Sequence, residues 1–125
     1  MISEELSYKI RGAIFEVYNQ VGPGLLESFY EEALCLELKR HGLDVKKQVP
    51  VKPRYKGAQM GIGYRIDLLV NDEVIIEVKS VEELHDVHKK QLLTYLKLTG
   101  KRLGILINFN VARIENKINL IRIVN

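Results

Sequence analysis

The chain has 125 residues, 46% of them hydrophobic, which suits one globular domain over residues 1–125 and excludes a disordered chain. Its formal net charge of +3 is compatible with a polyanionic partner but does not require one. A single cysteine, Cys35, excludes an internal disulfide, and no stretch approaches the roughly 20 apolar residues of a membrane span. Because residues 1–10 also lack the basic start and apolar run of a signal peptide, we expect a soluble, cytoplasmic protein.

Two helices are expected before the first strand. Ser3 is a suitable N-cap for the first helix, which continues to Val21 and is ended by Gly22–Pro23. The second helix is expected to start after Gly24 and to run to about His41–Gly42. Their apolar stripes are Leu6, Ile10, Ala13, Ile14, Val17 and Val21 in the first helix, and Leu26, Phe29, Tyr30, Ala33, Leu34 and Leu38 in the second. Glu27 lies in the first turn of the second helix, where a carboxylate suits the helix dipole, so a functional role for it requires a partner elsewhere.

Residues 45–55 predict an edge or irregular strand, because Pro50 and Pro53 cannot donate to a sheet ladder. The cations of this segment could follow a phosphate backbone, or they could keep an exposed sheet edge soluble. These cations are Lys46, Lys47, Lys52 and Arg54. The glycine-containing residues 56–62 predict a turn.

Residues 63–80, GYRIDLLVNDEVIIEVKS, predict two strands joined by a tight connection at residues 71–73. Apolar residues alternate along each strand, which indicates that both strands bury the same face. The register is then Val70 opposite Val74, Leu68 opposite Ile76 and Ile66 opposite Val78.

On the other face, this register places Asp67 directly across from Glu77 and Arg65 across from Lys79. Two opposed carboxylates about 4 Å apart repel each other by on the order of 4 kcal/mol at an effective dielectric of about 20. A hard divalent cation such as Mg²⁺ or Mn²⁺, beside the ammonium group of Lys79, would remove this repulsion. Alternatively, the four charged residues are solvated and act as cross-strand counter-charges. Apolar neighbours on the same face favour a covered functional site.

A third helix is expected from Ser80, as an N-cap with Glu83 three residues later, to about Thr99–Gly100. Its expected inward stripe is Leu84, Val87, His88, Gln91, Leu92, Tyr95 and Leu98. Gln91 and Tyr95 are four residues apart and therefore neighbours on one face. They are either a polar pair that hydrogen-bonds a partner or partly exposed residues at the edge of the buried face of the helix.

Two further strands are expected over residues 102–110 and 117–124, joined by a turn. The resulting order is helix, helix, strand, strand, strand, helix, strand, strand (ααβββαββ). The fold class is therefore α/β, or α+β, without an internal repeat or linker.

Residues 24–30, GLLESFY, fit GxxExxY, the signature of a group of small prokaryotic proteins that resembles the PD-(D/E)XK nuclease superfamily. The element order from the second helix onward is similar to the helix, three strands, helix and strand of that superfamily's core. Asp67 matches the first acid of its motif, with Ile66 in place of the nominal proline, and Glu77 and Lys79 match the (D/E)XK element. The resemblance implies a restriction-endonuclease-like core, with a mixed central sheet flanked by helices.

The resemblance also implies a metal site. Glu27 matches the acid that the first core helix often contributes. Glu27, Asp67, Glu77 and the carbonyl of Val78 would then hold one or two Mg²⁺ (or Mn²⁺) ions, which make hydroxide accessible near neutral pH.

Three further residues receive catalytic roles from the same resemblance. Lys79 would orient the attacking water or stabilise the charge that develops on phosphorus. Gln91 and Tyr95 match a QxxxY element of one exonuclease branch and would position Lys79 or the scissile phosphate. The implied reaction is hydrolysis of phosphodiester bonds in DNA or RNA, and a homodimer is among the implied assemblies because small nucleases of this fold often dimerise.

Two other functions stay open at this point. The chain could be a nucleic-acid-binding or regulatory module that keeps the fold without turnover, or an assembly component whose first helix pairs with a partner. The complete set of acids and lysine favours the enzyme, because a pure binder has little use for three convergent acids that repel phosphate.

Overall fold

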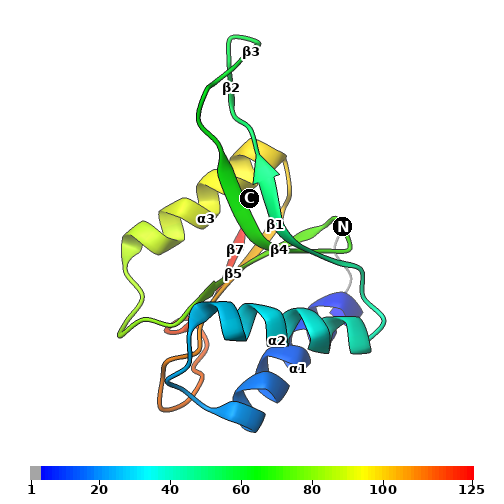
Figure 1. Ribbon diagram of the computed structural model, residues 1–125, viewed down its shortest axis with the longest axis vertical. Coiled ribbons are helices and arrows are strands. Elements are labelled where there is room, and N and C mark those ends of the chain that lie inside the picture. Colours follow the sequence, from blue (N-terminus) through cyan, green and yellow to red (C-terminus); the bar gives the residue numbers. More distant parts are fainter. Residues whose placement is uncertain (1–3) are drawn as a thin grey trace.

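A computed structural model describes residues 4–125 and places a five-stranded mixed sheet between helices (Figure 1). The strand order is β1-β4-β5-β6-β7, parallel only between β5 and β6, and a separate two-stranded ribbon, β2–β3, projects from one end. The elements are α1 (Glu4–Val21), α2 (Glu27–Arg40), β1 (Val45–Val51), β2 (Arg54–Tyr55), β3 (Ala58–Gln59), β4 (Tyr64–Val70), β5 (Val74–Lys79), α3 (Asp86–Thr99), β6 (Leu103–Asn108) and β7 (Leu120–Val124). The predicted fold class and the order of the longer elements are confirmed. The short ribbon is new, because β3 lies where a turn was expected.

Two apolar clusters lie on opposite faces of the sheet. α1 and α2 cover one face, where the buried Tyr30 and Phe109 are among the largest side chains. α3 covers the other face through Leu92, Tyr95 and Leu96. Within residues 4–125, no helix combines the length and apolarity needed to cross a membrane.

The first helix matches its prediction over most of its length. The apolar stripe is buried except at its last member, Val21, which is partly exposed where the helix ends. Gly22 then adopts a left-handed backbone with φ 65°, as expected for a residue that terminates a helix. The predicted N-cap, Ser3, lies outside the described residues.

The second helix begins later than the sequence suggested. Leu26 is the residue before the helix and is 76% exposed, and Phe29 is also exposed, so neither belongs to the core as predicted. The buried side chains are Tyr30, Leu34, Cys35 and Leu38. The reason is geometric: residues 22–26 form a loop, so the inward face starts only at Tyr30.

The third helix starts at Asp86, not at Ser80, and residues 80–85 form a bent connection. The hydroxyl of Ser80 donates a hydrogen bond to the carbonyl of Leu25, so it does not cap the helix. Val87 and Leu98 are exposed, whereas Leu96, absent from the predicted stripe, is buried. The expected end of the helix at Gly100, with φ 72°, is confirmed.

The register of the central hairpin is confirmed at Val70–Val74 and Leu68–Ile76, where the ladder ends. The expected face of Ile66 is wrong: it packs under α3, on the opposite side of the sheet from Leu68. Strand alternation therefore breaks at Asp67. On the neighbouring strand, Gln48 lies at the matching position with φ 52°, a left-handed backbone that breaks alternation there too.

We predict that Gly104→Ala destabilises the protein, because a Cβ at this position in β6 would lie 2.7 Å from Cδ1 of Leu92 in α3. Overpacking of this kind costs about 1–3 kcal/mol. Gly12→Ala is the matched control, since a Cβ there meets nothing within 4 Å and the exposed position in α1 favours alanine by about 0.5–1 kcal/mol. Urea unfolding measures both changes, and a Gly104 variant as stable as the native protein would contradict the packing of α3 on β6.

Candidate functional site

The central feature of the candidate site is the gap between β4 and β5 beyond the Leu68–Ile76 pair. Oε2 of Glu77 accepts a hydrogen bond from the backbone N–H of Asp67 at 2.8 Å. Oδ2 of Asp67 accepts one from the backbone N–H of Val78, also at 2.8 Å. Each carboxylate thus takes the place of a ladder partner on the other strand. The expected ladder pairs Asp67–Glu77 and Arg65–Lys79 are not formed, because the side chains hold the strands apart.

The carbonyl of Val78 points into the same gap. In a strand, the N–H and C=O groups of one residue face the same neighbouring strand, and successive residues alternate. The N–H of Val78 bonds Asp67 in β4, while the carbonyl of Lys79 accepts a bond from Phe109 at 3.0 Å beyond the end of β6. The Val78 carbonyl therefore faces β4, next to the two carboxylates.

The two acids are costly to ionise in this position. Glu77 is only 3% exposed, and burial, followed by the charge of Asp67, raises the pKa of Glu77 to about 8. Burial also raises the pKa of Asp67. The ammonium group of Lys79 partly offsets the upward shift in the pKa of both carboxyls. The site is a buried pair of acids beside one cation.

Glu27 is positioned by the loop that precedes α2. Oε2 of Glu27 accepts a hydrogen bond from the N–H of Ser80, at 3.2 Å, directly after Lys79. The hydroxyl of Ser80 in turn donates to the carbonyl of Leu25 at 2.6 Å. After burial, the charge of Glu27 is among the causes that raise the pKa of Asp67.

Tyr30 explains the spacing of the GLLESFY segment. Its buried hydroxyl donates to the carbonyl of Gly22 at 2.6 Å and accepts from the N–H of Leu25 at 3.1 Å. Its ring stacks on Phe109, with ring centroids 4.5 Å apart. Gly24 has φ 99°, which a residue with a side chain rarely adopts. Glycine shapes the loop, tyrosine fixes it, and the glutamate between them is presented at the end of β5.

Glu31 and Gln48 also lie beside the acids, although the sequence pattern did not predict a role for either. Glu31 follows Glu27 by one turn of α2, and burial, together with the charge of Asp67, raises the pKa of Glu31. Gln48 donates to Oε1 of Glu31 at 2.7 Å and lies 3.5 Å from Oδ1 of Asp67. The i, i+4 spacing of two glutamates on one helix could have indicated Glu31. Nothing local indicated Gln48, since its role depends on the left-handed backbone of β1.

α3 contributes Tyr95 to the surroundings of the acids. Tyr95 is buried in the cluster that contains Ile66 and Ile75, and burial, followed by the charges of Glu77 and Asp67, raises its pKa to about 12, so the phenol stays protonated at neutral pH. Its ring also packs edge-on against Tyr64. Gln91 is exposed, and its side chain forms no hydrogen bond with the described residues, so the structure does not join it to the acids.

The connection after Lys79 is held by Asn108, another residue that sequence reasoning passed over. This fully buried side chain accepts from the N–H of Val81 at 3.0 Å and donates to the carbonyl of Val81 at 2.9 Å. Because β5 and β6 are parallel, Asn108 lies opposite Lys79. The end of β5 is therefore fixed from both sides, by Asn108 and by the loop before α2.

The donors in the gap suit a hard cation only in part. Within residues 4–125, Oδ1 of Asp67 has only the long contact to Gln48 and Oε1 of Glu77 has no hydrogen-bond partner, so each acid keeps one oxygen for another ligand. Carboxylate and carbonyl oxygens are the ligands that Mg²⁺ and Mn²⁺ prefer. Among residues 4–125, however, no three His, Cys, Asp or Glu side chains are gathered closely enough to hold a metal ion. Asp67, Glu77 and the Val78 carbonyl fit such an ion, and Glu27 would have to leave Ser80 to join them.

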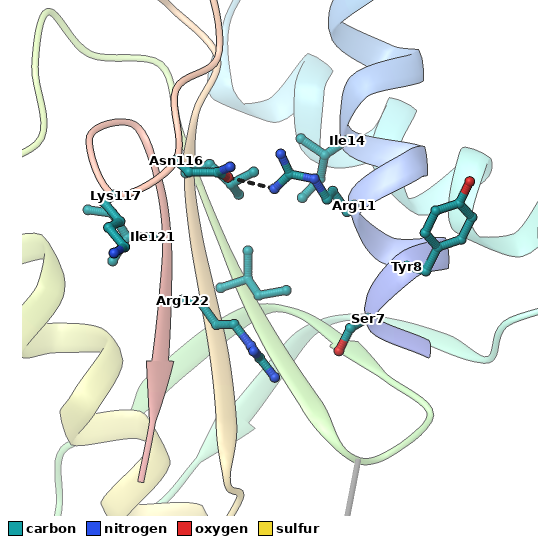
Figure 2. A pocket seen from close by; sticks show the side chains of 10 residues that line it. Ser7, Tyr8, Arg11, Ile14, Asn116, Lys117, Ile121 and Arg122 are labelled. Carbon is teal, nitrogen blue, oxygen red and sulfur yellow. Dashed lines mark hydrogen bonds between the residues drawn. The ribbon is translucent and has the colours of Figure 1, made fainter. Parts of the chain in front are cut away.

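A separate cavity of about 530 Å³ lies between α1 and the β6–β7 pair (Figure 2). Arg122 extends from β7 toward Ser7, and Arg11 donates to Oδ1 of Asn116 at 2.6 Å. The lining contains no acid, so this cavity cannot supply the ligands of a hard cation. It is not part of the carboxylate site.

The fold and the carboxylate–lysine arrangement define a restriction-endonuclease-like protein. A family model of the PD-(D/E)XK nuclease superfamily matches residues 4–121, so the chain belongs to this superfamily. A search of curated proteins and a search of solved structures each found no match.

We predict that Glu77→Gln removes a pH-dependent destabilisation. Below about pH 4.5 the glutamate is neutral in both states. Between pH 4.5 and about 8 it ionises freely only in the unfolded chain, so native stability falls as pH rises through this range. The glutamine variant lacks this loss of stability, which is at most on the order of 5 kcal/mol.

Urea unfolding in EDTA from pH 5 to 8.5 measures the difference. The variant should gain stability over the native protein as pH rises, whereas Glu73→Gln, at an exposed turn between β4 and β5, should not. Parallel curves for the native protein and Glu77→Gln would show that Glu77 is not buried beside a second acid.

Proposed function

We propose that this single domain is a divalent-metal-dependent nuclease that hydrolyses phosphodiester bonds in DNA or RNA. The observation that carries the proposal is the reciprocal pair of bonds that Asp67 and Glu77 make across the β4–β5 gap, with Lys79 beside them. Membership of the PD-(D/E)XK nuclease superfamily supports a nucleic-acid substrate and the use of divalent metals.

Asp67, Glu77, the Val78 carbonyl and Glu27 would hold the metal. When bound, Mg²⁺ or Mn²⁺ supplies a Lewis acid for the phosphate and an activated water. The raised pKa of Glu77 means that this acid gives up its proton when it becomes a ligand near neutral pH, so binding would be coupled to proton release.

The remaining residues act on the substrate through their own groups. The Lys79 ammonium would stabilise the negative charge that develops on the phosphoryl oxygens. The Tyr95 phenol, protonated at neutral pH because its pKa is raised to about 12, would donate a hydrogen bond to the scissile phosphate. Gln91, exposed one turn earlier on α3, would contact the strand at the edge of the site.

The second candidate is a nucleic-acid-binding module without turnover. It is favoured by the position of Glu27, whose carboxylate is engaged with Ser80 and is not gathered with Asp67 and Glu77 into a three-ligand group. The two candidates differ in whether metal binding is followed by cleavage.

We predict that the native protein cleaves DNA or RNA with Mg²⁺ or Mn²⁺, and that Glu77→Gln and Lys79→Met each lower the rate by about 10²–10⁴-fold, because each removes a group that acts in the transition state. Glu73→Gln is the matched control and should retain full activity, since Glu73 is exposed in the β4–β5 turn. Gel assays of labelled DNA and RNA measure the rates.

Cleavage that persists unchanged in Glu77→Gln would indicate a contaminating nuclease and contradict the proposal. Calorimetry with Mn²⁺ separates the two candidates. If the native protein binds Mn²⁺ and Asp67→Ala abolishes the heat of binding, but the native protein cleaves no nucleic acid, the binding module is favoured.

A further inference from the structure

The positive charge of the chain is concentrated in one segment. Residues 45–66 contain six cations and no acid, so the rest of the chain, with 13 cations and 16 acids, is net negative by three. The six are Lys46, Lys47, Lys52, Arg54, Lys56 and Arg65. All six are exposed, and within residues 4–125 none of them forms an ion pair. These cations are free to meet an external polyanion.

Half of these cations lie on the ribbon, which we define as residues 52–63 and which extends beyond the body of the protein (Figure 1). Arg54 pairs with Gln59 and Tyr55 with Ala58, and the N–H of Met60 bonds the carbonyl of Pro53 at 3.0 Å. The guanidinium of Arg54 also donates to the carbonyl of Gly57 at 3.0 Å. The ribbon is therefore a twisted, hydrogen-bonded hairpin.

The tip of the ribbon carries a cation at a conformational cost. Lys56 and Gly57 are the two loop residues, with φ 49° and 83°. Such a pair of positive φ values is typical of type I′ turns, in which asparagine or glycine is preferred at the first position. A lysine there is disfavoured, because in the left-handed conformation its Cβ crowds the following carbonyl oxygen. Backbone strain at an exposed tip, with a charged residue in place of the favoured one, indicates a role in binding.

We propose that the ribbon binds double-stranded DNA by entering its major groove, with Lys52, Arg54 and Lys56 on the phosphates. This inference rests on the proposed nuclease function and specifies its substrate. The major groove of B-form DNA is about 12 Å wide and 8.5 Å deep and admits a two-stranded β-ribbon. The deep, narrow major groove of A-form RNA does not admit one.

The geometry allows the ribbon and the acids to contact one duplex. From the Val51–Tyr64 pair at its base, each limb has about six residues and reaches at most about 20 Å. Tyr64 is three residues from Asp67, or about 10 Å along β4. The combined reach of about 30 Å is close to one helical turn of DNA, about 34 Å. A phosphate could therefore lie at the acids while the ribbon contacts the same duplex.

A single strand fits the ribbon less well. Tyr55 is 62% exposed and could stack on a base, but platforms for single strands use successive aromatic side chains. The Nζ atom of Lys56 lies 5.4 Å from the centroid of the Tyr55 ring and covers one of its faces. The other large exposed apolar residue of the ribbon, Ile62, has no aromatic face to offer.

The test measures binding by fluorescence anisotropy in EDTA, with a 20-base-pair DNA duplex, an RNA duplex of the same sequence and the DNA single strand. The triple variant Lys52→Ala, Arg54→Ala, Lys56→Ala should bind the DNA duplex at least about tenfold more weakly. Its slope of log K against log salt should be smaller by about 2–3, the share of three phosphate contacts. The control Lys39→Ala, Arg40→Ala, Arg122→Ala removes the same charge from exposed positions away from the ribbon and should keep the native slope.

Lys56→Asn separates binding from folding. Asparagine tolerates the left-handed backbone, so the melting temperature should stay equal or rise, while the salt slope for the DNA duplex should fall by about 1. If Lys56 has only a structural role, the salt slope of Lys56→Asn for the DNA duplex should equal that of the native protein. An unchanged slope would overturn the inference that the ribbon binds DNA.

Two outcomes would refute the proposed role of the ribbon without affecting the proposed nuclease. The first is that the ribbon variant and the control variant bind the DNA duplex equally well. The second is that binding of the RNA duplex or of the single strand depends on the ribbon as strongly as binding of the DNA duplex. If Glu77→Gln still abolished cleavage in those cases, the proposed nuclease would stand. Conversely, ribbon-dependent binding of duplex DNA without any cleavage would support the ribbon and contradict hydrolysis.

Discussion

The architecture of the site depends on two hydrogen bonds in which carboxylates replace a sheet ladder. Glu77 accepts from the N–H of Asp67, and Asp67 accepts from the N–H of Val78, each at 2.8 Å. These bonds satisfy backbone groups that the opened strands would otherwise leave unpaired, at the cost of burying two acids side by side. The gap, the freed carbonyl of Val78 and the raised pKa of Glu77 all follow from this exchange.

The surrounding structure keeps the gap in place from three directions. Tyr30, stacked on Phe109, fixes the loop that presents Glu27 to the end of β5. Asn108 holds the chain directly after Lys79 from the β6 side. α3 packs Tyr95 against the same face of the sheet as Ile66 and Ile75. Glu77 and Lys79 lie on β5, which pairs in parallel with β6, so these two candidate side chains are carried by a buried strand and not by a loop.

Sequence periodicity predicted the fold well because the hairpin at residues 63–80 and the first helix follow regular burial patterns. The predictions failed where local geometry departs from regularity. The face of Ile66 was wrong because alternation breaks at Asp67, and the start of α3 was wrong because Ser80 bonds a distant loop and not its own helix. The role of Gln48 could not be predicted for the same reason, because its contacts depend on its own left-handed backbone within a strand. The irregular positions are those of the candidate site, as expected when function overrides local rules.

The proposed site requires that the two opposed acids, Asp67 and Glu77, share one cation. Crystals grown with Mn²⁺ and measured at a wavelength sensitive to its anomalous scattering would test this most directly. We expect one anomalous peak between the carboxylates of Asp67 and Glu77, in contact with the Val78 carbonyl. No peak in the gap at saturating Mn²⁺, with both carboxylates still bonded to the backbone amides, would contradict it.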